Sequence, residues 1–222
     1  MKYEIKAQNF PVAVCSLAAG EAVMCQAGAM AWMTKGIKME TKSGGIGKMF
    51  TRAVSGESLF QNRYVAGQDG QIAFAANSPG EIRAVEVSPG HSIIAQKGSY
   101  LASDESVDLS VFVQKKVASG FFGGEGFIMQ KFSGSGTVLV EIDGGAIEYD
   151  LAAGEQMTID TGYLVMMDDT CSIDIVTVKG VGNVLFGGEG LFNTVVNGPG
   201  KIVLQTMPFV RMAARIASMS SQ

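Results

Sequence analysis

The sequence predicts an all-β protein made of three tandem repeats, because two separate glycine markers recur along it in step. In the first marker, a Gly-Glu or Gly-His pair is followed by another glycine eight residues after its own: Gly20-Glu21 with Gly28, Gly90-His91 with Gly98, and Gly154-Glu155 with Gly162. The second marker is a Gly-Glu pair that opens an apolar stretch: Gly56-Glu57, Gly124-Glu125 and Gly188-Glu189. The copies lie 70 and 64 residues apart for the first marker, and 68 and 64 for the second. Two markers that recur at nearly the same spacings indicate a structure made of three repeats.

The segments between the glycines have the pattern of short β-strands. Four of them are apolar or rich in β-branched residues: 71–75, 92–95, 137–142 and 172–178. Several alternate apolar with polar residues, which directs one face of a strand inward and the other outward. Turn dipeptides such as Asp69-Gly70 and Pro89-Gly90 separate them. Many short strands at this spacing predict a β-sandwich or barrel rather than a βαβ fold.

We expect one domain over residues 1–222, with repeats at about 1–76, 77–142 and 143–207 and a helical tail at 208–222. In each repeat, the first marker starts one strand and its second glycine turns the chain into another. A hairpin then closes the repeat, at 67–70, 134–136 or 198–200. Because one repeat alone leaves its strand edges unpaired, the three repeats are expected to complete one another's sheets with pseudo-threefold symmetry.

A short helix is predicted after Pro208. Arg211 and Arg215 lie one turn apart, and Met212 and Ile216 fall on the neighbouring face. We expect this helix to pack on the barrel or on a neighbouring subunit.

The composition points to self-association. Hydrophobic residues make up 47% of the chain and charged residues only 17%, which is little for a soluble surface. We therefore expect apolar surface in the interface of a homo-oligomer, with cyclic symmetry. The net charge of −4 argues against general nucleic-acid binding. No apolar run is long enough to span a membrane, and the polar start of the sequence lacks the apolar region of a signal peptide.

The sequence offers little for catalysis. The only histidine, His91, occupies the turn position held by Glu21 and Glu155, which favours a structural role. There is no Gly-x-Ser-x-Gly elbow, and the cysteines lack neighbouring metal ligands. These cysteines lie in apolar runs without a CxxC, and we expect buried free thiols in a cytoplasmic protein: Cys15, Cys25 and Cys171. We predict a protein that is not an enzyme and that has no catalytic residue, cofactor or metal.

The candidates for an interface or a ligand site are the repeated glutamates Glu57, Glu125 and Glu189. Three carboxylates around a shared axis would suit a hard cation such as Ca²⁺. The favoured interpretation is that each accepts hydrogen bonds from the backbone of the tight glycine turn beside it, because the flanking glycines repeat with the glutamate.

Two other functions rank lower. One is a hydrolase that uses an acidic patch: Asp160, Asp168, Asp169 and Asp174. The other is binding to RNA or to anionic lipid through a basic stretch: Lys35, Lys38, Lys42, Lys48 and Arg52. A solvated loop explains that stretch better. Within it, Gly44–Lys48 is similar to a Walker A loop, but Met49 replaces the Ser or Thr that would hold magnesium.

Several segments resemble one known family. Arg52 begins an Arg-x-x-x-Gly-Glu-Ser-Leu-Phe sequence within residues 44–64, and glycine-rich segments follow at 122–127 and 186–191. Together they are similar to the altered inheritance of mitochondria protein 24 family, whose prokaryotic members are largely uncharacterised. The resemblance spans nearly the whole chain and implies a β-fold like that of the tryptophan RNA-binding attenuation protein, TRAP.

The resemblance implies no catalytic residues. Fungal relatives are tied to organisation of the mitochondrial inner membrane, but the sequence lacks an Arg- and Ser-rich amphipathic leader, so a prokaryotic cytoplasmic setting is expected. TRAP binds RNA through repeated basic side chains. The residues repeated here are glutamates, so RNA binding does not follow from the fold. We expect a non-enzymatic scaffold or interaction protein acting as a homo-oligomer, with a small-ligand or cation-binding module as the alternative.

Overall fold

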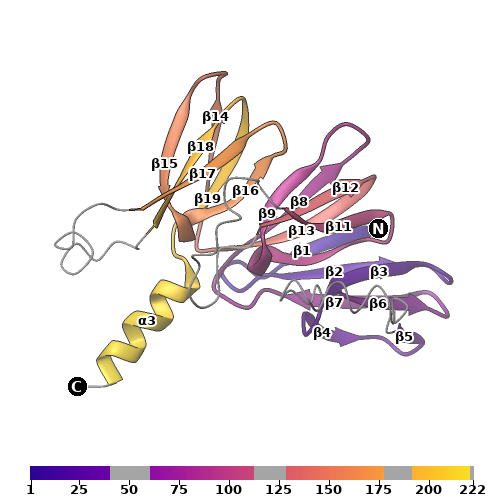
Figure 1. The fold of residues 1–222 in the computed structure, drawn as a ribbon. Coiled ribbons are helices and arrows are strands. Elements are labelled where there is room, and N and C mark those ends of the chain that lie inside the picture. The colour runs from indigo at the N-terminus through magenta and orange to yellow at the C-terminus, as the bar shows by residue number, and fades with distance from the viewer. Residues whose placement is uncertain (41–60, 113–128, 178–191, 221–222) are drawn as a thin grey trace, which may run out of the picture. The chain divides into compact units, whose positions relative to one another are not determined.

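The computed structural model describes residues 1–40, 61–112, 129–177 and 192–220. Most of these residues lie in β-strands, and one short α-helix ends the chain (Figure 1), which confirms the all-β prediction. The strands are β1 (Lys2–Lys6), β2 (Val12–Leu17), β3 (Ala22–Gln26), β4 (Met30–Met33), β5 (Ile37–Glu40), β6 (Gln61–Ala66), β7 (Gly70–Ala75), β8 (Gly80–Val87), β9 (Ile93–Gln96), β10 (Tyr100–Asp104), β11 (Val107–Phe112), β12 (Met129–Gly134), β13 (Gly136–Asp143), β14 (Ala146–Leu151), β15 (Gln156–Asp160), β16 (Leu164–Asp168), β17 (Ser172–Thr177), β18 (Phe192–Asn197) and β19 (Gly200–Gln205). The helices are the 3₁₀ turns η1 (Lys97–Ser99) and η2 (Thr161–Tyr163) and the α-helix α3 (Phe209–Ser220).

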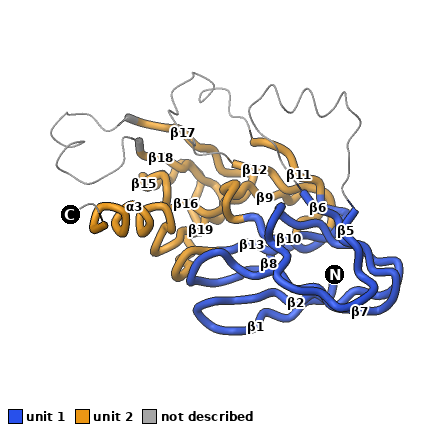
Figure 2. Tube along the Cα trace, turned by 90° about the horizontal axis from the view of Figure 1, so that it is seen from below, with its two compact units in different colours: residues 1–86, 100–107, 136–141 blue, residues 87–99, 108–135, 142–222 orange. Residues whose placement is uncertain are grey.

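The described strands form four antiparallel sheets. We call them sheet I (β1-β2-β7-β4), sheet II (β5-β6-β3-β10-β13-β8), sheet III (β11-β12-β9-β16-β19-β14) and sheet IV (β15-β18-β17). The chain divides into two compact units (Figure 2): residues 1–86, 100–107 and 136–141, and residues 87–99, 108–135 and 142–222. The first unit contains sheets I and II, and the second contains sheets III and IV. The predicted single domain of three repeats stays a prediction.

Each unit has an apolar core between its two sheets. In the first unit, Phe74 of sheet I and Val23 and Leu139 of sheet II are buried in one cluster. In the second unit, Ile202 of sheet III and Val196 of sheet IV belong to another. Burying a side chain of this size contributes roughly 1.5–3 kcal/mol. The inward face of each strand therefore holds its two sheets together.

The three glycine turns predicted to close hairpins connect different sheets instead, so the hairpin prediction is wrong. The turn at 67–70 leads from β6 in sheet II to β7 in sheet I, and the turn at 198–200 leads from β18 in sheet IV to β19 in sheet III. The turn at 134–136 likewise joins sheets III and II. A tight reversal can carry the chain into another sheet as well as to a neighbouring strand. Glycine is needed here because a Cβ at Gly136 would lie 2.8 Å from the Cβ of Asp104.

The first marker forms the same turn three times. Gly20, Gly90 and Gly154 have φ of +88°, +86° and +84°. The residue after each glycine donates its N–H to a carbonyl three residues earlier, with N···O distances of 3.0, 2.8 and 3.0 Å. A positive φ at the third position is the signature of a type II turn, which selects glycine. His91 lies in the second of these turns and is exposed, as predicted.

The predicted C-terminal helix is present as α3, directly after Pro208. Arg211 forms an ion pair with Asp160, and its guanidinium lies 5.2 Å from the centre of the Tyr163 ring. No residue of α3 is buried. The helix therefore meets the strands of its unit through its first turn. Of the helices in the described ranges, none has the length and apolar composition needed to cross a membrane.

All three cysteines are buried free thiols, as predicted. Cys15 on β2 and Cys25 on β3 lie in the core of the first unit. Burial raises the pKa of both thiols to about 12. Burial also raises the pKa of Cys171. A thiol in such surroundings stays protonated and unreactive at neutral pH.

We expect Gly90→Ala to destabilise the protein, because an L-residue at positive φ costs about 1 kcal/mol. Gly98→Ala is the matched control, since a Cβ at either position meets no atom within 4 Å and only Gly90 has a positive φ. Thermal unfolding should show a Tm lower by roughly 2–4 °C for Gly90→Ala alone. Equal Tm values for the two variants would contradict the strained-turn explanation.

We expect the unfolding free energy to fall as the pH rises from about 9 towards 12. The Cys15 and Cys25 thiols ionise near 9.0 when unfolded but near 12 when folded, so the unfolded chain releases protons first. Their stabilising contribution is complete below pH 9 and is lost above it. Denaturant titrations across this range measure the slope, which should be shallower for the Cys15→Ala, Cys25→Ala double variant. An unchanged slope in that variant would rule out the thiols as the cause.

Candidate functional site

The repeated glutamates Glu57, Glu125 and Glu189 lie outside the described residues. So do Lys42, Lys48 and the glycine-rich stretch at 44–48. The structure therefore leaves the interface and ligand interpretations of these residues as predictions.

Glutamates of the first marker do hold glycine turns. Glu21 accepts a hydrogen bond from the Ala18 N–H at 2.8 Å, and Glu155 accepts one from the Ala152 N–H at 2.7 Å. Each carboxylate thereby closes the turn that contains its own glycine. Because each carboxylate satisfies a backbone N–H of its own turn, Glu21 and Glu155 have a structural task.

The acidic patch suggested for hydrolysis consists of carboxylates that are separately engaged. Asp168 accepts the Lys201 backbone N–H at 2.8 Å, and Asp169 lies 3.0 Å from Lys131 Nζ. Asp160 pairs with Arg211, and Asp174 accepts from Asn197 at 3.3 Å.

The bond made by Asp168 recurs elsewhere in the fold. Asp104 accepts the Thr137 N–H at 2.8 Å, and the Thr34 hydroxyl accepts the Gln71 N–H at 2.9 Å. Thr34 directly follows β4, Asp104 ends β10 and Asp168 ends β16. These three strands correspond because each comes after the second glycine of the first marker. Each side chain fixes the start of the strand paired with its own strand: β7, β13 and β19. Asp168 thus has the position and bonding of a structural residue.

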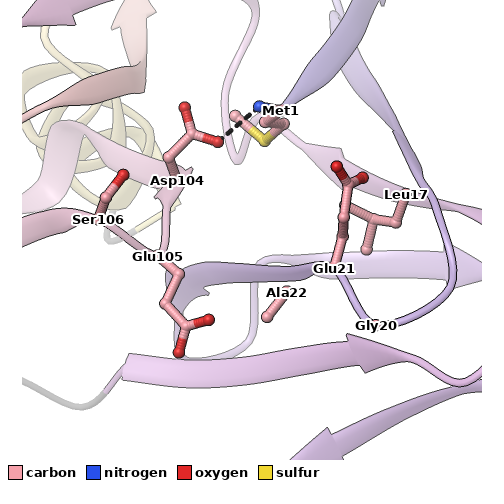
Figure 3. A pocket seen from close by; sticks show the side chains of 8 residues that line it. All are labelled: Met1, Leu17, Gly20, Glu21, Ala22, Asp104, Glu105 and Ser106. Atoms are coloured by element: carbon pink, nitrogen blue, oxygen red, sulfur yellow. Dashed lines mark ion pairs between the residues drawn. The ribbon is translucent and has the colours of Figure 1, made fainter.

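One hollow of about 400 Å³ opens in the first unit (Figure 3). Its lining is Met1, Leu17, Gly20, Glu21, Ala22, Asp104, Glu105 and Ser106. The amino group of Met1 lies 2.7 Å from Asp104, and the Arg63 guanidinium holds Glu105 at 2.6 Å. With Glu21 closing its turn, each of the carboxylates in the lining has a partner within the protein. Within the described ranges, no three His, Cys, Asp or Glu side chains are grouped so that they could hold a metal ion.

The unusual feature of the described surface is a pair of open sheet edges. β4 ends sheet I and β15 ends sheet IV. Trp32 and Met33 on β4 are 54% and 39% exposed, and Thr158 on β15 is also exposed. An unpaired strand presents a row of free backbone groups that another strand can join.

Other strands of the described structure also end sheets. β5, β11 and β17, which correspond to one another along the chain, are all edges. β8 and β14 are edges too, whereas the corresponding β2 is interior because the edge strand β1 pairs with it. By contrast, the strands that correspond to β4 and β15 along the chain are interior. β10 and β16 correspond to β4, and β3 and β9 correspond to β15. In the described structure, β4 and β15 are thus edges at positions that are interior in both of their corresponding strands.

Sequence reasoning missed these edges. The stretch around Trp32 has the composition of a buried strand, and no local pattern distinguishes an exposed edge from an interior strand. The spacing of the first marker carried the relevant signal, because it identifies β4 and β15 as the unmatched first and last members of their series.

Known proteins resemble this chain over most of its length. Residues 3–207 match the family described as mitochondrial biogenesis AIM24. An uncharacterized protein of Streptococcus pyogenes serotype M6 is 30% identical over 227 residues, which cover 97% of this chain and 90% of the relative. A crystal structure of a Streptococcus pyogenes protein superimposes with a TM-score of 0.82 at 28% identity, covering 98% of this chain and 99% of the other.

The match to the family extends across both compact units and confirms the family that the glycine-rich segments resemble. The fold is also that of the streptococcal structure. The chain therefore belongs to the AIM24 family.

Proposed function

We propose that the protein is a non-enzymatic scaffold that acts as a homo-oligomer. The observation that carries this proposal is the exposure of Trp32 and Met33 on the open edge of β4. On the interior strand β10, the corresponding residues Ala102 and Ser103 are fully buried. Monomeric proteins usually protect such edges with charge, proline or a covering segment. Large apolar side chains at an open edge instead favour association.

Further apolar side chains support a protein partner. On β1, Tyr3 and Ile5 are exposed, and on α3 so are Val210, Ile216 and Met219. The net charge of −4 favours another protein over nucleic acid. The cyclic symmetry expected of the oligomer and the TRAP-like fold expected of the chain are part of this proposal.

The bonding of the ionisable groups supports a role without catalysis. A catalytic carboxylate or histidine needs freedom to exchange a proton with a substrate. Asp168 is committed to the Lys201 N–H, and His91 lies in an exposed turn. The three buried thiols support a reducing compartment such as the cytoplasm.

Light scattering coupled to size-exclusion chromatography should give the mass of two or more whole chains at micromolar concentration. Trp32→Ala should raise the dissociation constant about 30-fold, the effect of losing a buried aromatic anchor worth roughly 2 kcal/mol. Phe10→Ala is the control, because Phe10 is a large exposed aromatic outside the strands. A monomeric wild-type protein would overturn the proposal.

A further inference from the structure

Sheets II and III each contain one junction between strands of successive predicted repeats. In sheet II, β3 pairs with β10, and in sheet III, β9 pairs with β16. The matched residues in sheet II are Cys25↔Ala102, Met24↔Ser103 and Val23↔Asp104. Those in sheet III are Ala95↔Met166, Ile94↔Met167 and Ile93↔Asp168. The second junction repeats the register of the first, shifted by 70 residues on one strand and 64 on the other.

β4 and β15 are the unmatched members of these two series. β4, β10 and β16 each carry a register shift at the same place: between Met30 and Trp32, Tyr100 and Ala102, and Leu164 and Met166. β15 follows the same Gly-Glu turn that precedes β3. β15 therefore corresponds to the first strand of a junction, as β3 and β9 do, and β4 corresponds to the second, as β10 and β16 do.

Extending the observed register assigns a partner to each residue at these edges. Shifting Ala102 and Ser103 back by 70 residues gives Trp32 and Met33, and shifting Ala95 and Ile94 forward by 64 gives Ile159 and Thr158. The same step places Thr34 opposite Met157. The expected pairs are Trp32↔Ile159, Met33↔Thr158 and Thr34↔Met157.

The backbone hydrogen bonds agree with this register on both edges. Thr34 donates its N–H to Gln71 at 2.9 Å, inward to β7, so the N–H and C=O of Met33 point outward. Gly198 donates its N–H to the Glu155 carbonyl at 3.0 Å, so that carbonyl points inward, towards β18. Because backbone groups alternate in direction along a strand, the N–H and C=O of Thr158, three residues later, point outward. The two residues that the register places opposite each other are thus the two with outward backbone groups.

We propose that β15 of one copy of this chain adds to β4 of a second copy and completes a six-stranded sheet like sheets II and III. This inference rests on the proposed homo-oligomer and names its interface. The new sheet has the order β17-β18-β15-β4-β7-β2, which repeats the arrangement around β3–β10 and β9–β16. β1 would extend it by one strand.

Burial at the two observed junctions indicates what this pairing would cover. Ala102, Ser103 and Met167 are almost fully buried where they are paired. Trp32 and Met33 hold the same positions and are exposed, so pairing removes them from water. Their loss of exposed apolar area is the main driving force.

The observed junctions also share an ion pair that the proposed one lacks. Arg63 lies 2.6 Å from Glu105 beside β3–β10, and Lys131 lies 3.0 Å from Asp169 beside β9–β16. The corresponding positions hold Val195 and Lys35. The interface between copies is therefore expected to depend weakly on salt, unlike binding through the basic stretch that begins at Lys35.

The two edges differ, so copies join head to tail, and a chain blocked at one edge can still use the other. Met33→Pro removes the outward N–H of β4, and Thr158→Pro removes that of β15, while bonds to the sheet behind stay intact. Light scattering should find each variant monomeric by itself. An equal mixture should give a dimer and nothing larger, because each pair has one functional junction and two blocked ends. Circular dichroism and thermal unfolding verify that both variants are folded.

A disulfide tests the register without relying on proline. Residues opposite each other in a hydrogen-bonded antiparallel pair have Cα atoms about 5.5 Å apart, within the range of a disulfide. Mild oxidation of mixed Met33→Cys and Thr158→Cys chains should give a covalent dimer. Ser172→Cys, on the β17 edge of the same sheet IV, is the matched partner that should give none.

The outcomes separate this inference from the proposed function. If both proline variants keep the wild-type mass, or if Ser172→Cys cross-links as well as Thr158→Cys, the interface lies elsewhere while the homo-oligomer stands. A double Met33→Cys, Thr158→Cys chain that closes a disulfide only on itself would also overturn the pairing between copies. A monomeric wild-type protein would remove both proposals.

Discussion

Strand pairing across the boundaries of the predicted repeats is the constraint on which this structure depends. The strands of one predicted repeat are divided between two sheets, so neither set is a complete sheet by itself. In sheet II, β3 needs β10, and in sheet III, β9 needs β16. Backbone groups left unpaired inside a protein are costly, because each forfeits its hydrogen bond with water. The pairing of β3 with β10 and of β9 with β16 avoids that cost in sheets II and III.

The ionisable groups serve this same arrangement. Asp104 and Asp168 accept the backbone N–H of the second residue of β13 and β19, and Glu21 and Glu155 close the turns that lead into β3 and β15. A carboxylate that accepts a backbone N–H gains a charge-assisted bond, roughly twice as strong as a neutral one. The acidic residues that first suggest catalysis thus position strands.

Local sequence predicted much of the fold, because turns, strands and helix ends are local properties. The turns at Gly20, Gly90 and Gly154 lie where the marker places them, and the start of α3 follows Pro208 as expected. Strand order was beyond such reasoning, since β3 and its partner β10 are separated by a whole predicted repeat. The error at 67–70 has the same origin: the dipeptide Asp69-Gly70 specifies that the chain reverses but not which sheet receives it.

The candidate site shows a similar division. Glu57, Glu125 and Glu189 were conspicuous because they repeat, yet they lie outside the described residues. Trp32 and Met33 were inconspicuous because an edge strand and a core strand have the same composition. What distinguishes them is that β4 ends its sheet in the described structure. Whether a strand ends a sheet depends on the topology of the whole fold and cannot be predicted from the sequence of one segment.

The passage of the chain from one sheet to the other at nearly every turn has a consequence for how the protein acquires its shape. During synthesis β3 leaves the ribosome long before β10 exists, so the edge of β3 that β10 will join stays unpaired while the polypeptide grows. Topologies with distant contacts fold slowly, because loop closure must precede the gain from pairing. Until β10 is synthesised, the nascent chain therefore carries an incomplete sheet. Its unpaired strand edge makes premature association with other nascent copies most favourable during this interval.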